Sequence, residues 1–524
     1  MSTFATLRAL HALIGDALSE VERIYRDQPG HGPLDYPSPD VPFYKAAPHA
    51  PEQEAAEKLT SDPWVMDAVG RIVAACGQLV ASVQRPFPQL TDAVMADHIT
   101  SCLAYLEASH TVEILRTAGC DGMHVRDLVR AIDELRSAAA HGSDFQPTDP
   151  GKLSHILRLL ATHHWTREVR PDVFANNRLS AFVDSGKTVD QLRAAPEKKY
   201  DGADGIAALV AMKGDDFYKS CAYITDQLLP ERERSVALRK LRDRERKSEP
   251  PARYKAPFNL AFDTELGYFD WLEQPENKTR LTQFGRAMTG ARGWEANEDI
   301  TAVYPWKDLP KDSVVIDVGG GIGSTSIVLA KAFPHLRFVV QDRQPVVDIA
   351  PSIWESTHAD LIQSGRVSFM VQSFFEAQPP TIEVPGVGSI SSPAVFVIRG
   401  CTHNWPDAEV EKMLRHLRAA AAPTTELLIV DTILALACLD DTEDEEPVPG
   451  AERSLAPEGS PLLANLGRAY ASGYLLDISM LAVLGAKERT LREITALARA
   501  AGWKVTGMSR APGSLWGYMC AKPI

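Results

Sequence analysis

Apolar and polar residues are arranged in two different ways along the chain. From about residue 305 onward, short apolar runs bounded by glycine or polar residues alternate with stretches in which apolar residues recur every three or four positions. The short runs predict buried strands, and the longer spacing predicts helices. The expected strands lie at 313–318, 336–341, 366–371, 394–399 and 426–434. This order predicts an α/β fold, a doubly wound parallel sheet with helices packed against it.

The first part of the chain has the pattern of helices. Residues 1–27 follow a helical spacing with one wet face, whereas the Pro-, Gly- and His-rich stretch 29–51 predicts an extended linker. Residues 52–135 predict further helices, among them a single helix from Asp97 to Thr117. Residues 124–181 predict a small helical module that ends in a hairpin, which resembles a winged helix. Its candidate reading helix has almost no basic surface, so DNA binding is not expected.

Two segments are too polar to belong to a core. Residues 187–255 predict mostly helices, and the stretch 231–247 mixes both signs of charge, which is typical of an exposed helix with ion pairs or, alternatively, of a partner-binding helix. The acidic run that begins at residue 440 and the Pro-, Gly- and Ser-rich tail after it predict a disordered loop at about 440–460. The expected division is a helical region over 1–186, a helical linker or insert over 187–300 and an α/β domain over 301–524.

Length and composition restrict the class of protein. A chain of 524 residues is too long for one ordinary core, and 45% hydrophobic with 24% charged residues is the composition of a soluble globular protein. The net charge of −14 argues against a nucleic-acid or anionic-membrane partner, because both require basic surface. No run reaches the roughly 18 apolar residues of a membrane span, and the N-terminus lacks the pattern of a secretion signal.

The cysteines indicate the compartment. All seven are scattered, and no two form a Cys-x-x-Cys pair. They therefore predict buried thiols of a reducing compartment rather than disulfides or metal ligands. A cytoplasmic protein without a metal is the expectation.

A glycine-rich turn follows the first predicted strand. Residues 314–326 read Val-Val-Ile-Asp-Val-Gly-Gly-Gly-Ile-Gly-Ser-Thr-Ser, so that a strand runs into a turn and a helix begins directly after it. Glycines at such a turn let the backbone approach a bound ligand closely. The next strand ends at Asp342, where nucleotide-binding sheets place an acid that holds ribose hydroxyls. The spacing Gly-x-Gly-x-Gly is the form that S-adenosylmethionine enzymes use, although a purely structural turn remains the alternative.

A histidine and two acids follow the later strands. His403 comes shortly after the fourth strand, and Asp431 lies near the end of the fifth. Ligands of open α/β sheets bind at the carboxyl ends of the strands, so both side chains are expected at the nucleotide crevice. Glu488 precedes the helix that begins at Leu491. A histidine between two carboxylates suits a general base, although helix capping or surface charge explains either acid when it is taken alone.

From about residue 91 to 524 the chain resembles the S-adenosylmethionine-dependent O-methyltransferases of the caffeate and isoflavone type, including their fungal relatives. The resemblance rests on the glycine-rich turn, the acid after the second strand, His403-Asn-Trp405 and Gly485-Ala-Lys-Glu-Arg-Thr490, all in the family order. It implies a Rossmann-like cofactor-binding domain preceded by a mostly helical, winged-helix-like dimerisation domain. A homodimer is therefore expected.

The resemblance also implies a role for each matched residue. His403 would be the general base that removes the proton of the acceptor hydroxyl, with Asp431 and Glu488 flanking and orienting it. Asp342 would hold the ribose of S-adenosylmethionine. The other residues implied at the cofactor are Gly319, Gly321, Gln372, Ser373, Arg399 and Trp405. Those implied at the acceptor are Met288, Met480 and Asn404, although plain core packing accounts equally well for the two methionines.

The chain departs from the family pattern at several of these positions. Gln372 replaces the acid that usually meets the adenine amine, and its carbonyl oxygen can accept the same hydrogen bond without the charge. Arg399 stands where many relatives have a lysine, which preserves the charge but not the geometry. Asn404 stands where an aspartate often follows the histidine, and Asp431 is one methylene shorter than the glutamate of many plant relatives. None of these changes removes the base or the glycine turn.

The expected function is transfer of a methyl group from S-adenosylmethionine to a hydroxyl, expected to be phenolic, of a small aromatic molecule or secondary metabolite. Two alternatives use the same fold: a non-methylating, pericyclic-type reaction, and a silent ligand-binding protein that regulates a partner. Only the methyltransferase releases S-adenosylhomocysteine stoichiometrically. The residues do not identify the acceptor or the position that is methylated.

Overall fold

The chain folds into two compact units, each assembled from separate stretches of sequence. A computed structural model describes residues 2–30, 32–139, 145–229, 256–290, 300–440, 447–511, 514 and 516–524. The sheet unit consists of Met1–Gly15, Met66–Leu79 and Trp294–Ile524, and the helical unit consists of Asp16–Val65 and Val80–Gly293. Helices α1 (Thr3–Arg26) and α3 (Pro63–Val83) each contribute residues to both units.

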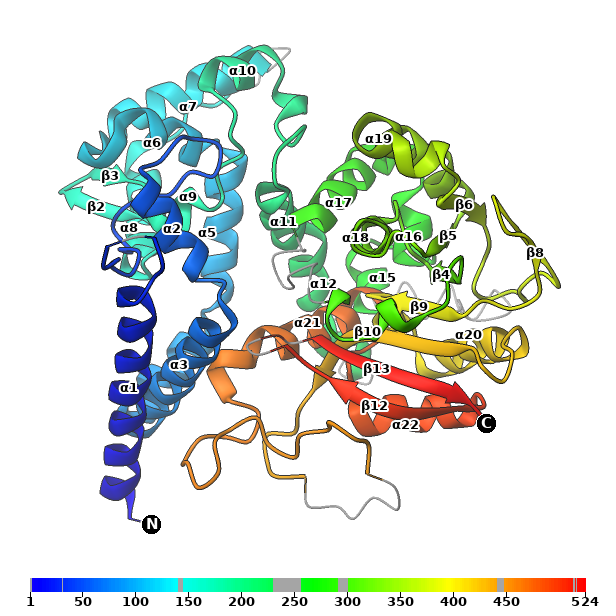
Figure 1. Ribbon diagram of the computed structural model, residues 1–524. Coiled ribbons are helices and arrows are strands. Elements are labelled where there is room, and N and C mark those ends of the chain that lie inside the picture. The colour runs from blue at the N-terminus through cyan, green and yellow to red at the C-terminus, as the bar shows by residue number, and fades with distance from the viewer. Residues whose placement is uncertain are drawn as a thin grey trace. The chain divides into compact units, whose positions relative to one another are not determined.

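A mixed sheet forms the centre of the sheet unit (Figure 1). Its strands lie in the order β12-β13-β10-β9-β4-β5-β6, and the short strand β11 pairs with β10. Their bounds are β4 Val314–Val318, β5 Arg337–Asp342, β6 Val367–Val371, β9 Val395–Arg399, β10 Glu426–Leu434, β11 Arg489–Thr490, β12 Trp503–Ser509 and β13 Trp516–Pro523. The five strands predicted from the sequence are β4, β5, β6, β9 and β10, so the expected α/β fold is confirmed.

The expectation that the sheet is wholly parallel is wrong at one edge. β13 runs antiparallel to β10, and β12 runs antiparallel to β13. Antiparallel neighbours can follow one another through a short connection, whereas parallel neighbours need a long crossover. The sequence analysis assigned no strand after residue 434, so it missed this final hairpin. It also missed the separate hairpin of β7 (Ile382–Val384) and β8 (Gly388–Ile390).

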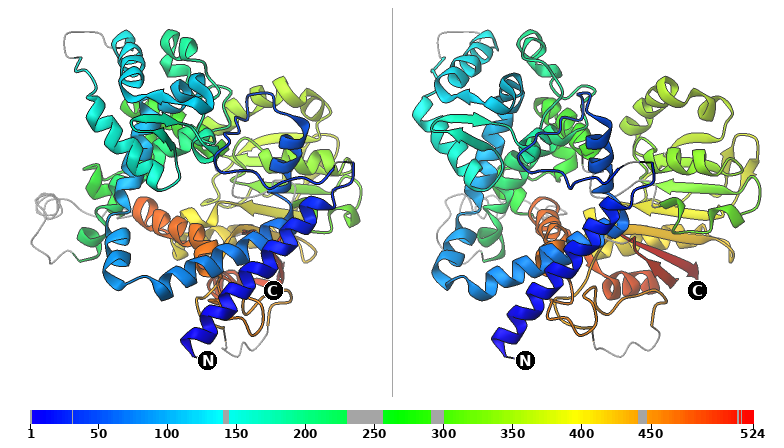
Figure 2. Two further views of the ribbon diagram at one scale, coloured as in Figure 1. Left: turned by 90° about the vertical axis from the view of Figure 1, so that its left-hand side faces the viewer. Right: turned by 60° about the vertical axis from the view of Figure 1, so that its left-hand side comes forward.

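Helices cover both faces of the sheet, as Figure 2 also shows. Their bounds are α18 Ser324–Ala332, α19 Gln344–Gln363, α20 Asp407–Ala419, α21 Ala471–Leu484 and α22 Leu491–Ala500. Ile316 belongs to the apolar cluster that includes residues of α20 and α22, whereas Val315 belongs to the cluster that includes α18 and α19. Adjacent side chains of a strand point to opposite faces, so burial of both faces requires the continuous apolar runs seen in the sequence.

The segment after β10 packs against the N-terminal helices within the sheet unit. Leu462, Leu466 and Tyr470 form one buried cluster with residues of α1 and α3, namely Leu10, Ala74 and Ala75. Within residues 447–461, the backbone N–H of Leu455 donates to the carbonyl oxygen of Ala464 at 2.7 Å, and the expected disorder of this loop stays a prediction. The acidic residues 441–446 of the predicted loop, and the charged stretch 231–247, lie outside the described residues.

The helical unit contains the helix and hairpin elements predicted for residues 124–181. A sheet of order β1-β3-β2 is formed by β1 (Met123–His124), β2 (Arg167–Arg170) and β3 (Val173–Ala175). The helices of the unit, besides the end of α1 and parts of α3, are α2 Pro51–Leu59, α4 Pro86–Val94, α5 Asp97–Ala108, α6 Thr111–Ala118, α7 Val125–Ala139, α8 Pro150–Thr162, α9 Arg178–Ala181, α10 Val189–Ala194, α11 Ile206–Met212, α12 Tyr218–Cys221, α13 Ile224–Leu228, α15 Pro257–Ala261, α16 Tyr268–Leu272 and α17 Lys278–Gly290.

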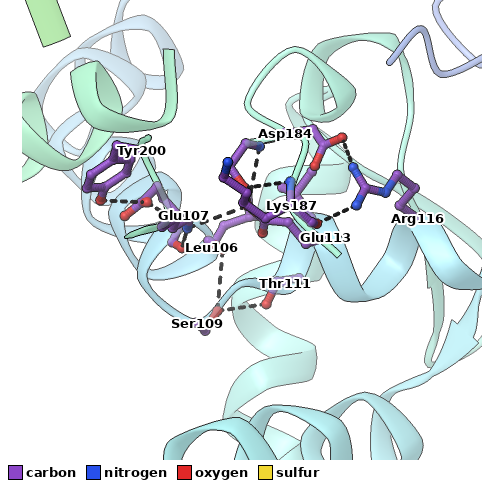
Figure 3. A network of polar contacts seen from close by, with 12 residues as sticks. Leu106, Glu107, Ser109, Thr111, Glu113, Arg116, Asp184, Lys187 and Tyr200 are labelled. Atoms are coloured by element: carbon purple, nitrogen blue, oxygen red, sulfur yellow. Dashed lines mark hydrogen bonds and ion pairs between the residues drawn. The ribbon is translucent and has the colours of Figure 1, made fainter. Parts of the chain in front are cut away.

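The single helix expected from Asp97 to Thr117 is in fact two helices, α5 and α6. The chain breaks at His110, whose φ of +56° lies in the left-handed region that a continuing helix does not use. The hydroxyl groups of Ser109 and Thr111 lie 2.7 Å apart at the break and hydrogen bond to each other (Figure 3). Apolar periodicity continues across the break, which is why the sequence pattern did not reveal it.

A buried ion-pair network holds the break and the segment 184–200 together (Figure 3). The ammonium group of Lys199 lies 2.7 Å from the carboxylate of Glu107 and 3.7 Å from that of Glu113. The Tyr200 hydroxyl donates to Glu107 at 2.9 Å, and the Ser185 hydroxyl donates to Glu113 at 2.6 Å. Lys199 and both glutamates are buried, so each charge depends on its partners for the solvation that water would otherwise provide.

Replacement of Lys199 by methionine is therefore expected to destabilise the protein by about 3–5 kcal/mol, because it leaves two buried carboxylates without their cation. Chemical denaturation followed by circular dichroism measures the loss. The matched control is Arg193→Met, which removes an exposed pair with Asp190 and is expected to cost less than about 1 kcal/mol. Equal losses in the two variants would show that the buried network does not carry this stability.

Candidate active site

The glycine-rich turn joins β4 to α18. A Cβ on Gly323 (φ +82°) would lie 2.8 Å from the ring of Trp354, so this glycine is required for close packing. Gly321 also has a positive φ of +60°, yet a Cβ there would meet no atom within 4 Å. The turn therefore packs tightly at Gly323 and leaves the backbone at Gly321 open, which is the geometry that lets a ligand approach the main chain.

Asp342 at the end of β5 is bonded to this turn. One of its carboxylate oxygens accepts a hydrogen bond from the N–H of Gly321 at 2.8 Å, and the other accepts from the N–H of Arg343 at 2.8 Å. The structure thus brings together two features that the sequence placed 21 residues apart. A carboxylate has about four acceptor sites, so these two bonds fix Asp342 and leave capacity for ligand hydroxyls.

The sequence analysis overlooked Asp317, which connects β4 to the start of α18 directly after the glycine-rich turn. It is the buried fourth residue of β4, and its carboxylate accepts a hydrogen bond from the hydroxyl of Ser326 at 2.7 Å. Burial raises the pKa of Asp317 to about 6, although the Ser326 hydrogen bond and the charge of Arg399 act in the opposite direction. The signal was present in the sequence as the single acid within an otherwise apolar strand.

Arg399 and Gln372 border the same turn. The guanidinium group of Arg399 donates to the hydroxyl of Thr325 at 3.1 Å and lies over the ring of Trp516, 5.4 Å from its centroid. The N–H of Gln372 donates to the carbonyl oxygen of Asp342 at 3.1 Å. Its side-chain amide nitrogen donates to the carbonyl oxygens of Ser373 and Ala377, at 3.0 and 3.1 Å, which leaves the amide oxygen as its accepting group.

An aromatic cluster lies next to Ser373. The rings of Phe375 and Trp405 meet edge to face with centroids 4.7 Å apart, and Phe374 lies 5.8 Å from Trp405. A Cβ on Gly319 would lie 3.4 Å from the Phe374 ring, so the cluster extends to the glycine turn. Trp405, predicted at the cofactor, therefore packs with the segment after β6.

His403 lies in a short 3-10 helix, Thr402–Asn404, which follows β9. Its Nδ1 lies 2.7 Å from the carboxylate of Glu488, and because a carboxylate only accepts, Nδ1–H is the donor. The Glu488 side chain is fully buried, and that of His403 is 14% exposed. Burial lowers the pKa of His403, but the charge and hydrogen bond of Glu488 outweigh it and raise the pKa to about 9. The pair fixes the ring and leaves Nε2 as the second nitrogen.

Asp431 reaches the histidine segment through a different residue. Its carboxylate accepts a hydrogen bond from the hydroxyl of Thr402, the residue before His403. Burial raises the pKa of Asp431 to about 6, and the charge of His403 acts in the opposite direction. Among the described residues, one oxygen of Asp431 and one of Glu488 are buried without a hydrogen-bond partner. The expected flanking of His403 by two acids is thus direct for Glu488 and passes through Thr402 for Asp431.

Each residue of the motif Lys487-Glu-Arg-Thr490 contacts the His403 segment or a helix next to it. Lys487 pairs with Asp407 at 3.1 Å, and the side chain of Thr490 caps α22 in a capping box with Glu493. Glu488 binds His403, and Arg489 is bonded to the segment that carries His403. The sequence analysis used this motif only as a family signal and assigned a role to Glu488 alone. The missed signal was the arginine that directly follows Glu488 in this motif.

The predicted acceptor residues are distributed over both units. Asn404 donates from its amide nitrogen to the carbonyl oxygen of Gly400 at 3.3 Å, and Met480 is buried in α21. Met288 lies in α17 of the helical unit and is 39% exposed. That the two methionines together contact an aromatic acceptor stays a prediction. Within the part of the chain that the structure describes, no group of three or more His, Cys, Asp or Glu residues could hold a metal ion.

Sequence comparison adds the family context. The family model of the O-methyltransferase domain matches residues 241–446. The chain is 34% identical to an O-methyltransferase of Armillaria gallica over 86% of this chain and 87% of that protein. It is 33% identical to 4-O-methyltransferase 1 of Phanerochaete chrysosporium, over 88% of this chain and 89% of that one.

Solved structures show a similar fold at low sequence identity. The mitomycin 7-O-methyltransferase MmcR matches with a TM-score of 0.55 and 21% identity, over 83% of this chain and 97% of that one. LepI, solved in complex with SAM, matches with a TM-score of 0.59 and 16% identity, over 90% of this chain and 97% of that one. At such identities the likeness concerns the fold alone.

Replacement of Glu488 by glutamine is expected to lower the pKa of His403 from about 9 toward the ordinary value of about 6.5, because the anion that stabilises the imidazolium is lost. NMR titration of labelled histidines measures the pKa of His403, and the His403→Ala variant assigns its resonance. Because the folded pKa is raised, the pair stabilises the wild type fully below about pH 6.5 and loses this effect as pH rises through about 9.

The matched control is Glu411→Gln, which removes a pair with Arg415 on the neighbouring helix α20 and is expected to leave the His403 titration unchanged. An unaltered His403 pKa in Glu488→Gln would contradict the assignment of the shift to this carboxylate.

Proposed function

Because this chain belongs to the O-methyltransferase family, we propose that it transfers the methyl group of S-adenosylmethionine to a phenolic hydroxyl of a small aromatic molecule, with His403 as the general base. The observation that carries the proposal is the 2.7 Å hydrogen bond between His403 and the buried Glu488. It lies at the edge of the sheet where the strands β4, β5 and β9 deliver the glycine turn, Asp342 and the histidine segment.

The described residues fit S-adenosylmethionine. The open backbone at Gly321 and the glycine at 319 would accommodate its methionyl part, and Asp342 retains acceptor capacity for the ribose hydroxyls. The amide oxygen of Gln372 would accept from the adenine amine, which needs an acceptor but not a charge. When bound, S-adenosylmethionine supplies a methyl group activated by its positively charged sulfur.

His403 would take the proton of the acceptor hydroxyl on Nε2, while Glu488 holds Nδ1–H and stabilises the imidazolium that forms. A phenol has a pKa of about 10 and His403 one of about 9, so the proton passes between groups of similar basicity. At pH 7 the ring is mostly protonated in the ligand-free protein, because its pKa lies about two units higher. Turnover at subsaturating substrate is therefore expected to rise with pH until about pH 9.

The mass spectrum of the reaction products tests the proposal. Purified protein is incubated with S-adenosylmethionine and a panel of catechols, flavonoids and polyketide phenols, and S-adenosylhomocysteine and methylated acceptor are followed together. His403→Ala is expected to lower turnover by about 10²–10⁴-fold with little change in S-adenosylmethionine affinity, because the base acts only on the acceptor. The exposed His155 provides the control variant, His155→Ala, with turnover unchanged.

Three outcomes would overturn the proposal. Unchanged turnover in His403→Ala would refute the role of His403 as the general base. Loss of cofactor affinity in that variant assigns His403 to binding instead. Tight S-adenosylmethionine binding by the wild type with no S-adenosylhomocysteine across the panel favours a silent binding protein or a non-methylating reaction, of the class that a similarly folded pericyclic reaction enzyme represents.

We further propose that the helical unit forms a homodimer through α4 and the end of α3. Phe87, Leu90 and Val94 are spaced as one helical face, and they are 74%, 58% and 64% exposed. Val80 and Val83 at the end of α3 are exposed as well. Exposed apolar side chains gathered on one helical face are typical of an interface. α3 is long and apolar enough to cross a membrane by length and composition, contrary to the expectation from the sequence that no run reaches that length. The net charge of −14 disfavours an anionic membrane surface, so a second copy, held by the apolar contacts alone, is the partner that we propose.

The double variant Phe87→Glu with Leu90→Glu is expected to convert the dimer into a monomer, because it places charges in the apolar face. Sedimentation velocity measures the mass, and Leu439→Glu, at an exposed leucine outside α3 and α4, is the control. A monomeric wild type would refute the dimer. Sedimentation of the wild type with phosphatidylcholine–phosphatidylserine vesicles, lost in the double variant, would assign the surface to a membrane.

A further inference from the structure

Arg489 lies in the sheet unit directly after Glu488 and is almost completely buried, with 3% of its side chain exposed. It belongs to the short strand β11, which pairs in parallel with the end of β10 through Ile433. This pairing fixes the backbone of Arg489 relative to the sheet. Burial of a charged arginine is costly unless every donor is satisfied, so its partners indicate what the residue does.

The guanidinium group binds the chain on both sides of His403. Nη1 donates to the carbonyl oxygen of Thr402 at 2.9 Å, and Nη2 donates to the carbonyl oxygen of Trp405 at 2.7 Å. Nε donates to the carboxylate of Asp407 at 3.0 Å, the first residue of α20. One planar group therefore connects the residue before the histidine, the residue two positions after it and the start of the next helix.

The segment 400–406 needs such a partner because it is irregular. It turns at Gly400, with φ of +57°, and then forms one 3-10 turn. Backbone carbonyl groups in a segment of this kind lack the partners that a sheet or an α-helix would supply, and buried carbonyl groups must be satisfied elsewhere. Arg489 supplies a donor for the carbonyl oxygen of Trp405 and a second donor for that of Thr402, which also accepts from the N–H of Trp405 at 3.2 Å.

We propose that Arg489 is a positioning residue for His403, and this inference rests on the proposed role of His403 as the base. Glu488 holds the imidazole side chain of His403, while Arg489 holds the backbone that carries it. Two successive residues thus fix the same histidine from two directions. Arg489 acts through His403 and has no role of its own in moving the proton.

Arginine suits this role better than lysine. Its planar fork presents donors in fixed directions, which matches carbonyl oxygens on opposite sides of a turn, whereas the lysine ammonium is a single point of charge. Arg489→Lys keeps the charge beside Asp407 and loses the two-sided hold on the turn. A displacement of about 1 Å at a catalytic group can cost about 10²-fold in rate, so the effect of this variant is expected in turnover.

The experiment compares Arg489→Lys with Arg418→Lys. Arg418, on α20, also donates to two backbone carbonyl oxygens, those of Gly502 at 3.0 Å and Ile524 at 3.1 Å, but these belong to the C-terminal part of the sheet unit. The control therefore removes the same kind of contact without touching the histidine segment. Turnover is measured with S-adenosylmethionine and the phenol of the panel that the wild type methylates fastest, and each lysine variant is also made in the His403→Ala background.

The expected result for Arg489→Lys is a fall of kcat by about 10–100-fold with unchanged S-adenosylmethionine affinity, against no change in kcat for Arg418→Lys. In the His403→Ala background, Arg489→Lys is expected to cause no further loss, because the group that it positions is already absent. Losses that multiply in the double variant, or equal losses in the two lysine variants, would overturn the proposal.

A second readout does not depend on turnover. NMR titration is expected to show the pKa of His403 falling toward 6.5 in Arg489→Lys, because a displaced ring loses part of its bond to Glu488, and staying at about 9 in Arg418→Lys. Burial lowers this pKa, and the charges of Glu488 and Asp431, with a hydrogen bond to the backbone of Gly400, raise it. If His403→Ala keeps full turnover, the general-base proposal fails while this titration still tests the positioning. An unchanged His403 titration in Arg489→Lys would refute it.

If Arg489→Lys does not fold, Asp407→Asn is the substitute. It keeps the guanidinium group on the carbonyl oxygens of Thr402 and Trp405 and weakens its anchor at α20, together with the ion pair between Asp407 and Lys487. A smaller shift of the His403 pKa in the same direction is expected. No shift in this variant would likewise contradict the proposal.

Discussion

The parallel register of four strands decides where the glycine turn, Asp342, the His403 segment and Asp431 lie. β4 pairs in parallel with β5 and β9, and β9 pairs in parallel with β10. Residues that follow parallel neighbours arrive at the same edge of a sheet, so the glycine turn, Asp342 and the His403 segment meet there. Arg399 pairs with Val430, which places Asp431 one step beyond the end of β9. A slip of one residue would turn Asp431 to the opposite face and remove its bond to Thr402.

Several buried charges lie at the same edge of the sheet. The rest of the fold must offset the free-energy cost of burying them. Asp317, Asp431 and Glu488 are buried carboxylates, and Arg489 is a buried cation. Each of them has a specific partner: the first turn of α18 for Asp317 and the His403 segment for the other residues. Burying charge stabilises a fold poorly, but the hydrogen bonds of these groups fix the geometry of the segments that they hold. The apolar layers on both faces of the sheet supply the stability.

Much of the sheet could be predicted from the sequence because its evidence is local. Strands buried on both faces need continuous apolar runs, and β4, β5, β6, β9 and β10 were found for that reason. The break at His110 and the hairpin of β12 and β13 depend on φ angles and on pairing between distant residues, which no short window contains. The contact of Leu462, Leu466 and Tyr470 with α1 and α3 is of the same kind, since its partners lie some hundreds of residues away.

The sequence by itself determined the family, five strands of the sheet in their order along the chain and the candidates His403, Asp342 and Glu488, because motifs and apolar periodicity are properties of neighbouring residues. Only the tertiary structure decided which groups touch. It bonded Asp342 to Gly321, directed Asp431 to Thr402 rather than to the imidazole, and placed the guanidinium group of Arg489 across the histidine turn. The physical reason is that a hydrogen bond depends on distances of a few tenths of an ångström, and only the packed sheet and helices set these distances.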